Sequence, residues 1–302
     1  MKPSGVRIVF AGLATLDVIQ SVERMPTANQ KVVALDSVVA SGGPATNAAV
    51  AAAHLGAHVT LVTALTHGPI AEIIRADLAA CSVDVRAAHT DAAPVVASIL
   101  VSRATGHRAI VSPTSSASVS TAVPLASGDV EALLDGVGAV HLDGYYPALA
   151  VPIAAAARER GIPVVVDLGS YKPHSSEILR ASTVAVVSSD FAPPGVAPTP
   201  EAILAYLRAH GAEGVAITMG ADGVVLPGVS LPAPSVHAVD TCGAGDFFHG
   251  ALTYRIASLG WQTARFASDL EFAAVVAGRS IESFGTRSWL SSAQGQVPPK
   301  AR

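Results

Sequence analysis

The chain has 302 residues, of which 50% are hydrophobic and only 14% are charged, whereas soluble domains carry about 25% charged residues. Its formal net charge is -4, from 19 basic and 23 acidic residues, which excludes a disordered chain and a basic surface for nucleic acid. The two cysteines, Cys81 and Cys242, are too few for a disulfide framework and favour a reducing, cytoplasmic location.

Apolar runs of strand length alternate with helical patterns along the chain. They predict an α/β fold with a doubly wound, mostly parallel sheet that is covered on both faces. The predicted strands are residues 6–11, 59–65, 139–142, 164–167, 184–187 and 215–218. The predicted helices, each ending near a glycine or a small polar residue, are 45–55, 70–80, 149–160 and 201–210. A single domain over residues 1–302 follows.

Two segments without intervening helices predict a small β-strand lid beside the main sheet. Residues 31–40 have the pattern of one strand, and residues 95–101 and 108–111 have the pattern of a hairpin. We therefore expect the lid to form from segments at about 13–41 and 94–112.

The uncharged stretch between Asp36 and Glu72 is long enough to hold a membrane-spanning helix of about 20 residues. Gly42, Gly43 and Pro44 interrupt it, and no run of 18 apolar residues occurs in the chain. The sequence therefore predicts buried structure here and no membrane contact.

The strongest local signal is the run Asp240-Thr-Cys-Gly-Ala-Gly-Asp246, between a short strand predicted to end at Val239 and an apolar helical face ending at Gly260. Its small residues, here named the anion turn (Gly243, Ala244 and Gly245), lie at a helix N-terminus, where free N–H groups and the helix dipole bind anions. A carboxylate repels such an anion, so Asp246 is explained if it takes a proton from an attacking hydroxyl. The alternative is that Asp246 only stabilises the first helical turn.

This run resembles the C-terminal motif of the ribokinase, or PfkB-type, family of carbohydrate kinases. The run Ser41-Gly-Gly-Pro-Ala-Thr-Asn47 resembles the family's N-terminal glycine motif, and two motifs in the right order are more specific than one. The resemblance covers essentially the whole chain. It implies a ribokinase-like fold with a lid that often pairs subunits, so we expect a homodimer.

Within the family, the runs at 12–18, 82–86, 106–110 and 141–144 are most similar to ketohexokinase-like kinases. The resemblance thus implies transfer of the γ-phosphate of ATP to a hydroxyl of a small ketose or ketose derivative. Pro44 stands in place of a second sugar-binding asparagine, and a proline has no side-chain donor. This departure argues against fructose itself.

The resemblance also assigns roles to residues near both motifs. Those implied to bind sugar hydroxyls are Asp17, Gly42, Gly43 and Asn47. Arg108 is implied to reach towards the phosphates, and Asp246 to accept the hydroxyl proton while the amides of the anion turn stabilise the transferring phosphoryl group. Small residues leave backbone space for ATP at the positions implied to bind it, which are Thr218, Gly220, Ala221, Gly223, Gly243 and Gly245.

Cations are implied by the same resemblance. Mg²⁺ is expected to accompany ATP, and Asp190, near the family's usual metal residues, is a candidate for ordering it through water. Asp240 and the loop at 283–285 could supply oxygens to a monovalent cation such as K⁺. Lys172 stands where many members have an arginine, and lysine offers a point charge in place of a bidentate fork.

Three other functions remain open from the residues alone. A nucleoside kinase of the adenosine type shares the terminal motifs but needs aromatic side chains to stack a base, and aromatic residues make up only 5% of this chain. A dinucleotide-dependent oxidoreductase would have a G-x-G-x-x-G run after the first strand, where Gly12-Leu-Ala-Thr-Leu-Asp17 has one glycine. A non-catalytic sugar-binding regulator would not need Asp246 beside an anion turn.

Overall fold

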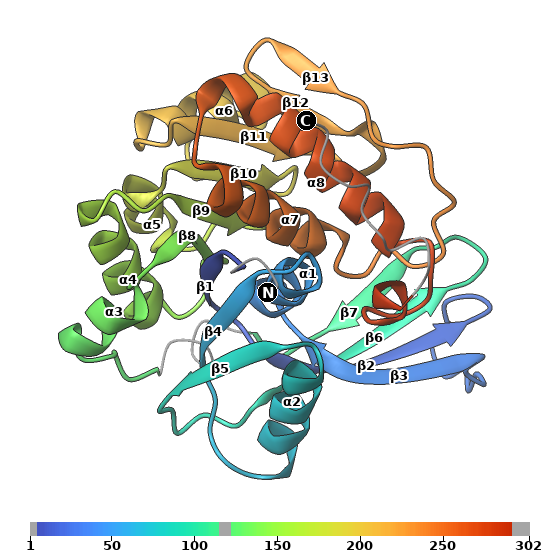
Figure 1. Cartoon of the computed structure of the whole chain (residues 1–302). Coiled ribbons are helices and arrows are strands. Elements are labelled where there is room, and N and C mark those ends of the chain that lie inside the picture. Colours follow the sequence, from blue (N-terminus) through green and yellow to red (C-terminus); the bar gives the residue numbers. More distant parts are fainter. Residues whose placement is uncertain (1–4, 115–121, 292–302) are drawn as a thin grey trace.

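The computed structural model describes residues 5–114 and 122–291, and a nine-stranded sheet forms the centre of this part (Figure 1). The strand order is β13-β12-β11-β10-β9-β8-β1-β4-β5, and all pairs from β11 to β5 are parallel, whereas β12 and β13 pair antiparallel. The strands are β1 (Arg7–Ala11), β4 (His58–Ala64), β5 (Val83–Ala88), β8 (Val137–Leu142), β9 (Val164–Leu168), β10 (Val184–Ser188), β11 (Gly214–Thr218), β12 (Val224–Leu226) and β13 (Val229–Leu231).

Helices cover both faces of this sheet, which explains why its central strands are mostly apolar runs. In β1, Ile8 and Phe10 face one hydrophobic cluster and Val9 and Ala11 face another. The first face carries α1 (Pro44–His54), α2 (Pro69–Ala80), α7 (Ala244–Leu259) and α8 (Phe266–Ser280). The second carries α3 (Ser127–Leu133), α4 (Pro147–Glu159), α5 (Ser175–Ala181) and α6 (Pro200–Ala209).

The chain winds in two directions from β1. It passes from β1 to β4 and β5 on one side, and later from β8 to β11 on the other. The carboxyl ends of β1 and β8 are therefore the switch point of the sheet, where ligands bind in open α/β folds.

A separate four-stranded sheet lies at one side of the molecule, away from β12 and β13 (Figure 1). Its order is β3-β2-β6-β7, with bounds Asp36–Gly42, Thr15–Val22, Val95–Ser102 and Arg108–Val111. Ile19 and Ile99 on its inner face belong to a buried cluster that includes Cys242 and is packed against by Phe284. The predicted lid is thus present, and it packs against the loop that precedes α7.

The six predicted strands of the main sheet and the four predicted helices are confirmed, with ends that differ by no more than two residues. Two predictions about strands are wrong. The short strand predicted to end at Val239 is absent, because residues 232–239 lie outside the sheet, which continues through the β12–β13 hairpin. The strand predicted at 31–40 begins only at Asp36 and extends to Gly42. The sequence also missed β2, β5, β12, β13, α3, α5 and α8 as elements.

The uncharged stretch between Asp36 and Glu72 forms β3, α1, β4 and the start of α2. None of the helices within residues 5–114 and 122–291 combines the length and the apolar character needed to cross a membrane.

Candidate active site

The two sequence motifs meet where α1 packs against α7. A side chain on Gly250 would collide with the Ala48 carbonyl, so this glycine allows the two helices to approach closely. The approach places Asn47 beside Asp246, and the Asn47 Nδ2 group donates a hydrogen bond to Asp246 Oδ2 at 2.9 Å. The structure therefore joins the predicted base to a predicted sugar-binding residue.

Asp246 lies in the first turn of α7, and its environment favours the protonated carboxyl group. Burial raises the pKa of Asp246 to about 7, with a further increase from the negative charge of Asp167, while the hydrogen bond from Asn47 acts in the opposite direction. A group whose pKa lies near the working pH is well suited to accept a proton.

The anion turn begins α7 as the sequence predicts. Gly243 precedes the helix with φ 75°, in the left-handed region that favours glycine. A Cβ there would lie 3.0 Å from the Phe247 ring and 3.4 Å from Asn47 Nδ2, whereas Gly245 is exposed. The first amides of α7 thus lie beside Asp246 at the positive end of a 16-residue helix.

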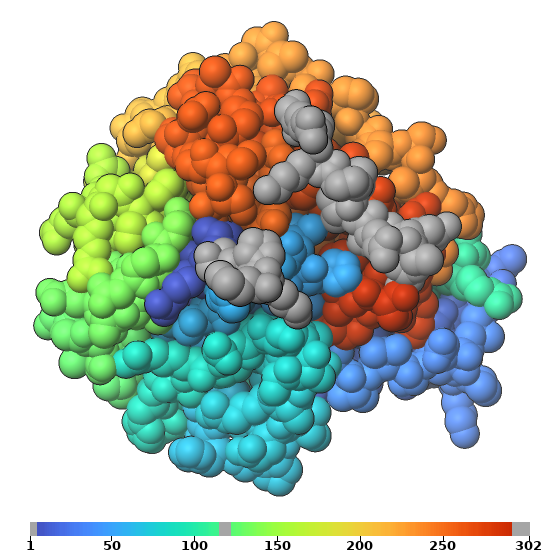
Figure 2. Space-filling model, in the orientation of Figure 1, coloured from blue at the N-terminus to red at the C-terminus, as the bar shows by residue number. Residues whose placement is uncertain are grey.

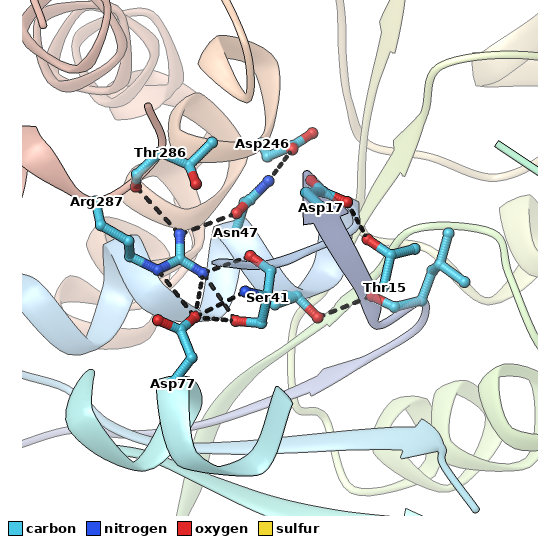
Figure 3. A network of polar contacts seen from close by, with 10 residues as sticks. Thr15, Asp17, Ser41, Asn47, Asp77, Asp246, Thr286 and Arg287 are labelled. Atoms are coloured by element: carbon cyan, nitrogen blue, oxygen red, sulfur yellow. Dashed lines mark hydrogen bonds and ion pairs between the residues drawn. The ribbon is translucent and has the colours of Figure 1, made fainter. Parts of the chain in front are cut away.

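Asp17 lies on β2 of the lid, close to Asn47 and Asp246 (Figure 3). Its carboxylate accepts a hydrogen bond of 2.6 Å from Thr15 Oγ1, and burial raises the pKa of Asp17. A Cβ at Gly42 would collide with this carboxylate, and Gly43 has φ 99°. The two glycines of the N-terminal motif therefore make room for Asp17 and for the turn into α1.

Arg108 on β7 links the lid to the loop before α7. Its guanidinium donates to Thr241 Oγ1 at 3.0 Å and to the Thr241 carbonyl at 3.3 Å. The pKa of the neighbouring Cys242 is influenced by the charges of Asp240, Asp17, Asp246 and Arg108. Burial is the main reason why the pKa of this thiol lies above its ordinary value, which favours the neutral thiol and a space-filling role for Cys242.

Four of the six residues predicted to bind the nucleotide share the turn after β11, and the other two, Gly243 and Gly245, lie at the start of α7. Thr218 ends that strand, Gly220 and Ala221 lie in a short 3-10 helix (Gly220–Asp222), and Gly223 has φ 90°. A Cβ on Gly223 would collide with the backbone of Leu231, so the close approach of β13 requires glycine there. Three strands separate β11 from β1 in the sheet order, and all of them are parallel.

The candidate cation ligands differ in how the structure surrounds them. Asp190 follows β10 and is exposed. Asp240 is buried, and its two carboxylate oxygens accept hydrogen bonds of 2.9 Å from the amides of Cys242 and Gly285. The nearby hydroxyl oxygens of Ser283 and Thr286 are buried without a hydrogen-bond partner, so this loop holds oxygen donors of the kind that hard cations prefer.

Within the described residues, no group of three or more His, Cys, Asp or Glu side chains could hold a metal ion by itself. An Mg²⁺ ion near Asp190 would therefore take most of its ligands from water and from phosphate oxygens, as Mg²⁺ commonly does.

Asp143 is a site residue that the sequence analysis did not identify. It follows β8 at the switch point, is 2% exposed, and accepts hydrogen bonds from the amides of Leu13, Ala45 and Tyr145 at 2.8 to 3.0 Å. Burial raises its pKa to about 6 against these hydrogen bonds. An aspartate directly after a predicted central strand was the available signal.

A second group of side chains lies around Lys172, the residue that stands in place of a family arginine. Its Nζ lies 4.5 Å from the centre of the Tyr145 ring, and burial lowers its pKa, while Asp143 and Asp167 raise it. Asp167 in turn approaches His249, with 3.4 Å between Oδ2 and Nδ1. The negative charges of Asp167 and Asp246 both raise the pKa of Tyr145, so Tyr145 and Asp167 lie near Asp246 at the border of the site.

Arg287 is the other missed residue, and no sequence pattern marks it. Its guanidinium donates to Asn47 Oδ1 and contacts Asp77 and Ser41 (Figure 3). Three distant segments of the chain are thereby brought into one polar network around the predicted base.

Comparisons with known proteins agree with this architecture. A family model described as pfkB family carbohydrate kinase matches residues 7–293. A candidate ribokinase from Agrobacterium tumefaciens is 25% identical, with a TM-score of 0.80 over 95% of this chain and 94% of that one. The ribokinase of Arabidopsis thaliana, solved with ribose and ATP, is 22% identical, with a TM-score of 0.74 over 96% and 100%. A ribokinase from Giardia lamblia is 19% identical, with a TM-score of 0.78 over 97% and 100%.

Proposed function

The chain belongs to the pfkB family of carbohydrate kinases, and from this membership we propose that it transfers the γ-phosphate of ATP to a hydroxyl group of a small ketose or ketose derivative. The observation that carries the proposal is the 2.9 Å hydrogen bond between Asn47 and Asp246 at the N-terminus of α7. It supports the proposal because a group suited to accept a proton, an amide suited to bind a sugar and the first amides of a helix, suited to bind a phosphate, lie next to one another.

Asp246 is the base in the proposed reaction. Its carboxylate takes the proton of the acceptor hydroxyl, and the oxygen attacks the γ-phosphorus in line. The amides of Gly243, Ala244 and Gly245 stabilise the negative charge that develops on the transferring group. The O–H bond and the bond to the ADP leaving oxygen break as the new O–P bond forms.

The sugar is proposed to bind between the lid and the main sheet. Asp17 and Asn47 offer an acceptor and a donor there, with Gly42 and Gly43 leaving space beside them. The ketose assignment follows from the short runs shared with ketohexokinase-like kinases, while the Arabidopsis relative was solved with ribose. Ketoses and pentoses are therefore the substrates to compare first.

The nucleotide is proposed to bind at Thr218, Gly220, Ala221 and Gly223, with its phosphates towards the anion turn. Mg²⁺ bound to ATP would neutralise phosphate charge, and Asp190 is the residue proposed to order it through water. The oxygens of Asp240, Ser283 and Thr286 are the groups proposed to bind a K⁺ ion, since the two hydroxyl oxygens are buried without a hydrogen-bond partner in the described residues. The turnover of the native protein should rise when K⁺ replaces a bulky organic cation, and that of Asp240→Ala should not. Equal turnover of the native protein with the two cations would contradict this site.

The lid is proposed to pair two copies of the chain. Register places Val18, Val39, Val96, Leu100 and Val111 on the face of the lid that points away from the main sheet. Val39 and Val111 are 54% and 74% exposed, and an exposed apolar patch of this kind commonly marks a protein interface. Light scattering should give a dimer for the native chain and a monomer for Val111→Asp.

ADP release measured with a panel of ketoses, aldoses and nucleosides tests the proposal. Turnover with ketoses above the other sugars supports it. Turnover with nucleosides alone would indicate a nucleoside kinase. A sugar that raises the melting temperature without any ADP release would instead indicate a sugar-binding regulator.

A further inference from the structure

Arg287 lies at the centre of a polar network that the proposed reaction does not yet explain. It belongs to the C-terminal segment, drawn in red, which lies beside the blue N-terminal segments in the space-filling view (Figure 2). Its side chain is 15% exposed, so the guanidinium is largely removed from water. A cation in such a position needs a partner for each of its N–H groups.

All five N–H groups of the guanidinium have acceptors among the described residues. Nε donates to Asp77 Oδ2 at 3.3 Å, and Nη1 donates to Asn47 Oδ1 at 3.2 Å and to the Thr286 carbonyl at 3.1 Å. Nη2 donates to the carbonyl and hydroxyl oxygens of Ser41 at 2.7 and 2.9 Å and approaches Asp77 Oδ2 at 3.1 Å. No donor is left over for a sugar or a phosphate, so Arg287 acts on protein groups.

The contact with Asn47 fixes which way its side-chain amide faces. The oxygen accepts from Arg287, and the nitrogen donates to Asp246 at 2.9 Å. A flipped amide would set its NH₂ group against the guanidinium and its oxygen against the carboxylate, which loses both hydrogen bonds. Arg287 thereby selects the one orientation in which the Asn47 amide can donate a hydrogen bond to Asp246.

The same guanidinium fixes the root of the lid. Ser41 is the residue of β3 that precedes Gly42, and its amide and hydroxyl group both donate to Asp77 Oδ2, at 2.9 and 2.5 Å. Arg287 therefore connects α2, β3 and α1 through Asp77, Ser41 and Asn47 (Figure 3). The lid strand that borders Asp17 and the helix that supports Asp246 are joined at this one side chain.

We propose that Arg287 is a positioning residue, which aligns the Asn47 amide with the Asp246 carboxylate and ties this alignment to the root of the lid. The proposal rests on the proposed role of Asp246 as the base. It predicts that loss of the guanidinium weakens a hydrogen bond that favours the carboxylate form of Asp246.

Arg287→Ala is the variant that tests the proposal, with Arg160→Ala as a matched control. Arg160 also forms an ion pair with an aspartate, at 3.1 Å from Asp135, but on the far side of the sheet. In Arg287→Ala we expect kcat to fall about 10- to 100-fold, the KM for ATP to change little, and the acid limb of the pH profile to move to higher pH. Added guanidinium should restore part of kcat and return the acid limb towards its native pH. The kcat of Arg287→Lys should lie between those of the native protein and Arg287→Ala, because lysine keeps the positive charge but lacks the bidentate guanidinium.

A second measurement does not depend on activity. The side-chain amide signals of Asn47 in an ¹⁵N spectrum, assigned by their loss in Asn47→Ala, should be shifted and protected from exchange in the native protein and should lose both properties in Arg287→Ala. If the native protein phosphorylates no sugar, or if Asp246→Asn retains full turnover, the proposed function fails while the amide signals still report on the orientation of Asn47.

Three outcomes would overturn the positioning role. The first is unchanged amide signals in a folded Arg287→Ala protein. The second is an acid limb that does not move although kcat falls. The third is a loss of turnover that follows the loss of folded protein and that guanidinium does not rescue, because a purely structural role would have that effect.

Discussion

Asn47 and Asp246 are separated by 199 positions in the sequence, and their side chains are joined by a hydrogen bond of 2.9 Å. The bond forms because α1 and α7 pack directly against each other at Gly250. It brings the glycine motif and the anion turn into a single site, and it influences the pKa of the proposed base.

Asp246→Asn should lower kcat by about 10²- to 10⁴-fold, because an amide cannot accept the hydroxyl proton. ADP release with the best sugar from the panel measures this effect. The variant should stay folded and still gain thermal stability from ATP, since an amide of nearly the same shape replaces the carboxylate. Asp135→Asn, on the surface, is the control, and turnover near the native value in Asp246→Asn would remove Asp246 from the mechanism.

The activity should depend on pH through Asp246, whose pKa burial raises to about 7. The base must be ionised to act, and its ionised fraction rises with pH. The value of kcat/KM should therefore increase from acid towards neutral pH and should fall about tenfold per unit well below the pKa. Asn47→Ala removes a hydrogen bond that lowers this pKa, so its acid limb should lie at higher pH than that of the native protein. An identical limb in both proteins would contradict the assignment.

Gly42→Ala should raise the KM for the sugar about tenfold or more, because the new Cβ would collide with the Asp17 carboxylate and displace it. The KM for ATP should stay close to the native value. Gly128→Ala is the matched control, since a Cβ at that position meets nothing within 4 Å. Equal sugar KM values in the two variants would show that Asp17 does not contact the sugar.

Asp143→Asn should lower the free energy of unfolding by about 1 to 3 kcal/mol, measured by urea denaturation. One carboxylate oxygen becomes a donor in this variant and faces a backbone N–H of Leu13, Ala45 or Tyr145. Leu13 leads into β2 and Ala45 follows β3, so the connections between lid and main sheet should loosen as well. A loss of less than about 0.5 kcal/mol, the range of ordinary surface substitutions, would contradict this role.

Arg108→Ala should weaken the closure of the lid, because its hydrogen bonds to Thr241 join β7 to the loop before α7. We expect the KM for the sugar to rise about tenfold and the release of ADP without sugar to increase, since a looser lid admits water to the site. Arg103→Ala, which removes a surface ion pair with Glu23 elsewhere on the lid, should change neither quantity. The same low sugar-independent ADP release in both variants would argue against a closing role.

The regular part of the fold could be predicted from local sequence. Strands covered on both faces are continuous apolar runs, and helices with glycine C-caps have clear ends, so β1, β4 and the helices α1 and α6 were found within two residues. The hairpin β12–β13 was missed because each of its strands has three residues, too few for a pattern. The apolar residues before Asp240 have the pattern of a strand, but within residues 5–114 and 122–291 they pair with no strand.

The sequence by itself determined the layered α/β architecture and the family resemblance, and it predicted a chemistry for each motif, because spacing and residue type act locally. Only the tertiary structure decided which motifs meet. Asn47 faces Asp246 because two helices distant in the chain pack together, and Arg287 enters the site because its guanidinium needs five acceptors, which Asp77, Ser41, Asn47 and Thr286 supply from separate segments. A buried charge selects its partners in three dimensions, and nothing in the spacing of residues along the chain specifies them.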